Sequence, residues 1–304
     1  DHRDLHLSLR RQRQMCIRDS ILTAGIRNKI DLICMFSLFK KKITIPHVRL
    51  TGVIGSAGRF RQGIDFSGQQ EIIKKAFSFK KAKNVAISIN SPGGSPVQSH
   101  LIHDYIRQLA KKNKKKVIIF AEDVAASGGY LIACAGDEIY ANSSSIVGSI
   151  GVISASFGFQ DAIKRIGIQR RVYTAGKNKS TLDPFKEEKE EDIQRIKKLQ
   201  LELHSDFINL VKKSRGSKLK DPEKNNIFTG EFWSGSASLR LGLVDGLGNA
   251  EQVLREKFGE NIVIKKLQKP KSFISRKLSS SLDNQIDGVI NALEERALWQ
   301  KFGL

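Results

Sequence analysis

The sequence predicts an α/β fold with a parallel-rich sheet, on three observations. From Val48 onward, short β-rich runs alternate with helical patterns, beginning VRLTGVI, QQEIIKKAF, NVAISI, VQSHLIHDYIRQLA and VIIFA. Strands separated by helices of this length imply right-handed crossovers, which place successive strands parallel to one another. Hydrophobic residues make up 40% and charged residues 27% of the 304 positions, an ordinary globular composition. One sizeable core with extensions fits this length.

The chain divides into four expected parts. Residues 1–20 show no sustained periodicity, and RQRQMCIRDS looks like translated sequencing adapter, so we treat them as non-native. Residues 21–46 read as a short basic and apolar arm. The α/β domain is expected over residues 47–260. Residues 261–304 begin with a strand and a basic, serine-rich linker, and end in an amphipathic helix, LDNQIDGVINALEERALWQ.

Two helices inside the domain bear on function. The pattern VQSHLIHDYIRQLA predicts a helix with a buried apolar stripe, which leaves His100 and His103 at the surface with no metal partner. Residues 186–214 predict a long charged helix with apolar residues on one side, which has to pack on the sheet or on a neighbour.

The net charge of +21 would attract nucleic acid, anionic lipid or acidic partners, and charge alone does not choose among them. The lysine runs lack the interleaved aromatic residues of a nucleic-acid platform, so we expect no nucleic-acid partner. A solvated surface is the simpler reading, and peripheral contact with an anionic membrane is the alternative. No window holds 18 apolar residues, so no membrane span is expected. Three cysteines without metal-ligand spacing favour a reducing compartment.

Two glycine-rich corners carry the candidate chemistry. INSPGGSP, residues 89–96, stands where a strand ends and a helix begins, and its glycines let backbone N–H groups point into a site. DVAASGGYLIACAG, residues 123–136, follows a buried strand and places Ser127 at a second corner. The Ser127 motif alone is weak, because a serine before two glycines is more often a turn or a helix cap than a nucleophile.

A serine nucleophile needs a base. The one histidine after Ser127 is His204, inside the long helix, which gives a Ser-His-Asp triad little support. A lysine can serve instead if burial lowers its pKa and leaves a neutral amine. Lys177 and Lys179 stand in an ordered, glycine-bearing turn, RVYTAGKNKSTLDPF. A phosphate-binding Walker motif is excluded there, because Asn178 follows Lys177 and the upstream glycine is absent.

Four segments in this order, INSPGG, AASGGY, SSIVGSIGV and AGKNKSTLDPF, resemble the signal peptide peptidase A (SppA/SohB-like) family of serine peptidases. The segment TGEFWSGSASLRLGLVDGLG resembles the one that closes the family's domain. The resemblance runs from about Val48 to Phe258 and implies a Clp/crotonase-like (ββα-superhelix) fold with a C-terminal helical extension. Residues 47–260 are then the signal-peptide-peptidase-like catalytic domain.

Matched residue by residue, the resemblance implies that Ser127 is the nucleophile and Lys179 the general base, with Lys177 the lesser candidate. Together they make a Ser-Lys catalytic dyad. A serine endopeptidase of this kind is implied to act on peptides such as cleaved signal peptides or other short apolar peptides. No metal or organic cofactor is implied.

The same matching assigns the oxyanion hole to the backbone N–H groups of Gly94 and Gly128, with Gly93 shaping the loop. Ser149 matches a hydroxyl that orients the lysine amine, and an ordinary strand-edge serine is its alternative reading.

The family resemblance also bears on assembly and location. It implies a homo-oligomeric ring with active sites shared between protomers, in a bacterial protein that is cytoplasmic or peripherally associated with the inner membrane. Bacterial members commonly carry an N-terminal transmembrane anchor, and none is visible in this sequence.

Two other functions stay open at this point. One is a crotonase-like enzyme acting on coenzyme A thioesters, which uses similar oxyanion glycines but needs neither Ser127 nor Lys179. The other is a non-catalytic scaffold that binds peptide or membrane.

Overall fold

The computed structural model describes residues 42–55, 63–268, 299–300 and 302. The chain forms two compact units, residues 1–43 and 44–304, and the description below concerns the second. The adapter-like residues 1–20 and most of the expected N-terminal arm lie outside the described residues. So does most of the expected C-terminal linker and helix.

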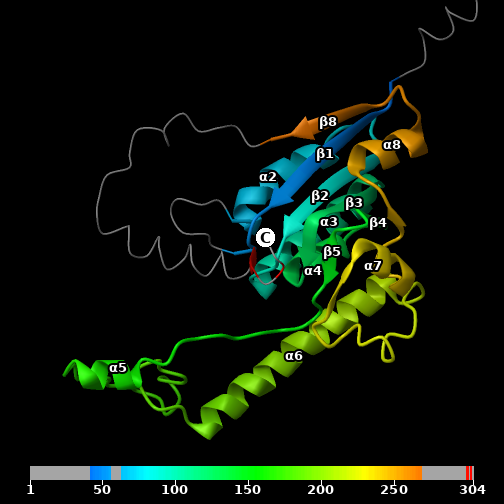
Figure 1. Cartoon of the computed structure of the whole chain (residues 1–304). Helices are drawn as coiled ribbons and strands as arrows, with labels where there is room; N and C mark the ends of the chain where they lie inside the picture. Colours follow the sequence, from blue (N-terminus) through cyan, green and yellow to red (C-terminus); the bar gives the residue numbers. More distant parts are fainter. Residues whose placement is uncertain (1–41, 56–62, 269–298, 301, 303–304) are drawn as a thin grey trace, which may run out of the picture. The chain divides into compact units, whose positions relative to one another are not determined.

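The second unit is built on a sheet with the order β6-β5-β3-β2-β1-β8, in which β4 also pairs with β3 and with β7. Figure 1 labels β1, β2, β3, β4, β5 and β8 of this sheet. The strand pairs are parallel except for β5 with β6. The parallel-rich α/β prediction is therefore confirmed. The sheet runs from Thr44 to Leu267, a few residues beyond the expected bounds of 47 and 260. The strands are β1 (Thr44–Thr51), β2 (Asn84–Ser91), β3 (Lys116–Ala126), β4 (Glu138–Ala141), β5 (Ile146–Gly148), β6 (Phe232–Ser234), β7 (Gly246–Leu247) and β8 (Val263–Leu267).

Helices connect most of the strands, and local signals set where several of them begin. Ser95 caps one helix by accepting a hydrogen bond from the backbone N–H of Gln98, and Pro96 occupies the first helical position, where its missing N–H costs nothing. Asp65 caps another helix in the same way. The helices are α2 (Phe66–Phe77), α3 (Pro96–Asn113), α4 (Gly128–Ala133), α5 (Gln160–Arg165), α6 (Glu190–Arg215), α7 (Gly235–Leu241) and α8 (Ala250–Phe258).

The core lies on both faces of the sheet. Strand β2 has seven buried residues of eight, because α2, α3 and α4 cover one face and α8 covers the other. Its sequence, NVAISINS, accordingly shows no strict alternation of apolar and polar residues. A rigid central strand of this kind fixes the position of the INSPGG corner that follows it.

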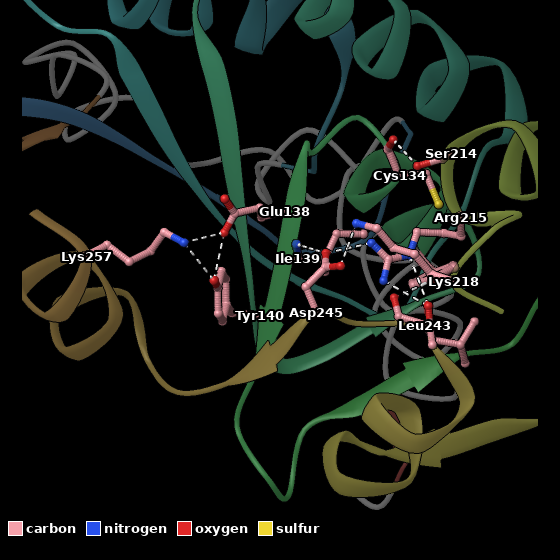
Figure 2. A network of polar contacts seen from close by, with 12 residues as sticks. Cys134, Glu138, Ile139, Tyr140, Ser214, Arg215, Lys218, Leu243, Asp245 and Lys257 are labelled. Carbon is pink, nitrogen blue, oxygen red and sulfur yellow. Dashed lines mark hydrogen bonds and ion pairs between the residues drawn. The ribbon is translucent and has the colours of Figure 1, made fainter. Parts of the chain in front are cut away.

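The long helix α6, expected over residues 186–214, is anchored at its C-terminal end by a partly buried ion pair (Figure 2). Arg215 is 1% exposed; its Nη1 lies 2.6 Å from Oδ2 of Asp245, and its Nη2 donates to the carbonyl of Gly242 at 2.8 Å. Lys218 donates to Oδ1 of Asp245 at 2.6 Å. Burial raises the pKa of Asp245, but the hydrogen bonds from Arg215 and Lys218 outweigh it, so this pKa lies below its ordinary value.

In the described part of the chain, no helix is both long enough and apolar enough to cross a membrane.

Candidate active site

Ser127 stands at a strained corner between β3 and α4. Its backbone has φ 52° and ψ −123°, a combination that L residues rarely adopt and that costs about 1–3 kcal/mol. Two hydrogen bonds hold the corner: the Ser127 N–H donates to the carbonyl of Gly148 at 2.8 Å, and the Leu131 N–H donates to the carbonyl of Ser127 at 3.0 Å. Strain of this kind, kept in place by surrounding contacts, is typical of functional positions.

Gly94 lies on the second corner, at a backbone position that only glycine can occupy. Its φ is +140°, and a Cβ there would lie 2.0 Å from the carbonyl oxygen of Ile54. Ile54 holds the corner on both sides, donating to the carbonyl of Gly93 at 2.8 Å and accepting from the N–H of Ser95 at 2.7 Å. The corner is therefore built around a close approach of two backbones.

The two corners pack directly on one another. A Cβ at Gly93 would lie 2.7 Å from the Cβ of Ser127, and a Cβ at Gly128 would lie 3.5 Å from the backbone nitrogen of Gly94. Among the described residues, the N–H groups of Gly94 and Gly128 donate to no protein acceptor. Two uncommitted backbone donors thus lie beside Ser127, the arrangement that an oxyanion hole needs.

Ser149 follows β5 at a third turn, with φ 53° and 6% of its surface exposed. Its N–H donates to the carbonyl of Glu231 at 2.6 Å. Gly148, just before it, packs against the ring of Trp233, where a Cβ would lie 2.8 Å from two ring carbons. These contacts fix the Ser149 turn against β6.

Ser127, Gly94, Gly128 and Ser149 line one cavity of about 680 Å³. Its walls are mainly apolar, as in most ligand-binding cavities. The apolar lining residues include Leu131, Val152, Ile153, Leu203, Phe207 and Phe302.

Lys179 does not lie in this cavity. It is exposed, in a turn where its N–H donates to the carbonyl of Gly176 at 3.2 Å and where Arg195 of α6 donates to Oδ1 of Asn178 at 3.2 Å. Residues 151–190, which contain this turn, have no buried member. The turn is ordered, as the sequence predicts, but within one chain the lysine is neither buried nor joined to Ser127 by any hydrogen bond of the described residues.

Sequence reasoning missed two histidines that line the cavity. His100, expected at the surface, lies on the first turns of α3 beside Gly94, and His204 reaches the cavity from α6. The Nε2 of His204 lies 3.1 Å from the carbonyl oxygen of Ile150, next to Ser149. His204 stands three residues before Phe207, which is buried, and residues three apart share one face of a helix. This spacing is the sign in the sequence that His204 faces the domain.

Comparison of the sequence with protein-family profiles identifies the family of this chain. Residues 109–261, half of the chain, match the profile of Peptidase family S49. The chain belongs to this family. The resemblance to SppA/SohB-like peptidases is thereby confirmed, and the parallel-rich α/β sheet agrees with the Clp/crotonase-like fold that it implied. The match includes Ser127, Ser149 and Lys179 but not the INSPGG corner.

Individual relatives add detail. A Brucella abortus protein named Na(+)/H(+) antiporter NhaA is 51% identical over 273 residues, which cover 86% of this chain and 37% of that protein. The chain thus spans little more than a third of this relative. The putative signal peptide peptidase SppA of Enterococcus faecium is 28% identical over 216 residues, covering 69% of this chain and 61% of that protein. Among solved structures, a mutant of the membrane-bound stomatin-specific protease 1510-N is similar with a TM-score of 0.45 and 14% identity, covering 76% of this chain and all of that one.

Proposed function

We propose that this S49 family member is a serine peptidase in which Ser127 is the nucleophile and Lys179 the general base. The observation that carries the proposal is the packing of the two glycine corners, which sets Ser127 in a strained turn beside the uncommitted N–H groups of Gly94 and Gly128. A nucleophile next to preorganised oxyanion donors is the arrangement that acyl transfer requires.

In the proposed mechanism, the neutral amine of Lys179 takes the proton from Oγ of Ser127 as this oxygen attacks a peptide carbonyl carbon. Gly94 and Gly128 donate hydrogen bonds to the resulting oxyanion, each worth about 3 kcal/mol in the transition state. The C–N bond then breaks, and the protonated lysine gives its proton to the leaving amine. Water, activated by the same lysine, hydrolyses the acyl-enzyme.

The proposal requires that Lys179 come from a second copy of the chain. Within one chain the lysine lies outside the Ser127 cavity, on residues 151–190, a segment with no buried member. Six large apolar side chains of this segment are exposed, and a second copy could cover them. They are Ile153 at 79%, Phe157 at 69%, Phe159 at 42%, Ile166 at 68%, Ile168 at 56% and Tyr173 at 90% exposed.

A neighbour's surface can receive these side chains. Val97 and Leu101 of α3 are 64% and 42% exposed, and His100, which lies between them in the sequence, lines the Ser127 cavity. We therefore propose that residues 157–190 of one protomer pack on α3 of the next and bring Lys179 to its Ser127, while Val152 and Ile153 line the cavity of their own protomer. Repeating such a head-to-tail contact produces a ring when the rotation from one protomer to the next returns to the first protomer after a whole number of copies.

In the assembled site, the hydroxyl of Ser149 is the proposed hydrogen-bond acceptor for the amine of Lys179. Its turn is held by Glu231, and among the described residues its hydroxyl has no protein partner. The hydroxyl can accept a hydrogen bond from the lysine amine and direct the amine toward Ser127.

The apolar cavity favours short apolar peptides, such as cleaved signal peptides, as substrates. The net charge of +21 favours peripheral contact with an anionic membrane.

Fluorophosphonate labelling followed by peptide mapping tests the nucleophile. We expect the label on Ser127, and its loss in Ser127→Ala. The matched control is Ser144→Ala, an exposed serine away from the Ser127 cavity, which should label as the unmodified chain does. A label that persists in Ser127→Ala would refute the assignment.

A further inference from the structure

A segment near the end of the chain, Trp299, Gln300 and Phe302, lies against the candidate active site. Phe302 is 8% exposed and shares a buried cluster with Val124 and Ala126, which Trp299 covers in part. The ring of Phe302 meets the ring of Phe232 edge to face, with centroids 5.2 Å apart. Phe302 also lines the same cavity as Ser127.

Phe302 contacts residues that are close to the nucleophile along the chain or across the sheet. Val124 and Ala126 are among the last three residues of strand β3, which ends directly before Ser127. Phe232 belongs to β6 and pairs with Gly148, whose carbonyl accepts the N–H of Ser127. The ring of Phe302 is thus part of the wall of the cavity that contains Ser127.

We propose that Phe302 is an intramolecular ligand of the Ser127 cavity, which competes with apolar peptides and lowers the affinity for them. The inference rests on the proposed peptidase function for the nature of the competing substrate. A ligand attached to the same chain has a high local concentration, so a modest apolar contact is enough to compete. Its chemistry fits, because the aromatic ring of Phe302 lines a mainly apolar cavity, and Trp299 packs on the adjoining apolar cluster.

A different role for Phe302 predicts the opposite result. If the ring is a permanent wall of the subsite, removing it takes contacts away from the bound peptide and weakens binding. If the ring is a competitor, removing it frees the space and strengthens binding. The sign of the change in affinity therefore separates the two roles.

Peptide binding is measured in a Ser127→Ala background, in which no hydrolysis can consume the ligand. The probe is a fluorescein-labelled peptide of eight residues, leucine and alanine, followed by fluorescence anisotropy. We expect Phe302→Ala to lower the Kd at least fivefold. The control Gln300→Ala changes an exposed residue of the same segment and should leave the Kd unchanged. A Kd that is raised or unchanged in Phe302→Ala, or no binding to either protein, would overturn the proposal.

A second measurement follows the segment itself. The chain contains two tryptophans, Trp233 and Trp299, so Trp233→Phe leaves Trp299 as the single reporter. Saturating peptide should shift the Trp299 emission to the red, because the ring leaves its apolar cluster for water. Emission that stays unchanged at saturation would refute displacement. Both measurements are independent of hydrolysis, so a failure of the catalytic proposal, read from labelling of Ser127, is seen separately.

Discussion

Gly128 offers a sharp test of how the two corners fit together. A Cβ at this position would lie 2.4 Å from Oγ of Ser99 but 3.3 Å from Cδ1 of Ile54 and 3.5 Å from the nitrogen of Gly94. The hydroxyl of Ser99 is thus the main obstacle to Gly128→Ala. Gly128 is the first residue of α4 and has no positive φ, so the substitution adds no backbone strain. Overpacking of this size should cost about 1–3 kcal/mol.

Removing the obstacle should restore most of that loss. Ser99→Ala deletes a hydroxyl that donates to the carbonyl of Ser95 at 2.9 Å, but the same carbonyl still accepts the N–H of Ser99 at 3.1 Å. No buried acceptor is left without a partner, so Ser99→Ala alone should cost about 1 kcal/mol or less. The double variant should therefore be about as stable as Ser99→Ala, which gives a coupling of about 1–3 kcal/mol between the two positions.

The assay is urea unfolding followed by circular dichroism for all four proteins of the cycle. Peptide hydrolysis, measured in parallel, should fall in Gly128→Ala because the shifted corner misplaces an oxyanion donor, and should recover in the double variant. Costs that simply add, with no recovery in the double variant, would refute the packing on which the active-site argument depends.

Three further predictions concern catalysis and stability. Ser127→Ala and Lys179→Ala proteins should each be inactive, and mixing them equally with subunit exchange verified by tagging should restore about a quarter of the activity; no recovery would rule out a site shared between protomers. Lys179→Arg should be inactive in peptide hydrolysis, because arginine keeps its proton and cannot act as a base; an active arginine variant would eliminate the dyad. Because contacts to Arg215 lower the pKa of Asp245, its stabilising effect is complete above the ordinary pKa of 3.8 and is lost as the pH falls below it. Asp245→Asn should weaken the acid dependence of unfolding measured by urea titration, whereas exposed Asp161→Asn should leave it unchanged.

The candidate corners could be predicted from the sequence because each is a local pattern. Strand-like runs ending in INSPGG and AASGG mark places where a parallel strand turns into a helix, and glycines there show that backbones come close. The long helix was expected at residues 186–214 and is found at Glu190–Arg215, since its charged and apolar residues repeat with the helical period. The turn that holds Lys179 was also marked by its own glycine and lysines.

What the sequence by itself determined, then, is the order of strands and helices, the glycine corners and, through family resemblance, the residues proposed to act. Only the tertiary structure decided which surfaces meet: Gly93 against Ser127, His204 against Ile150, and Phe302 against Val124. These contacts join residues far apart in the sequence, and no local pattern encodes them because they depend on how packed layers close around one another. The tertiary structure also decided that Lys179 is separated from Ser127 within one chain. Its segment, residues 151–190, has no residue buried against the rest of the chain.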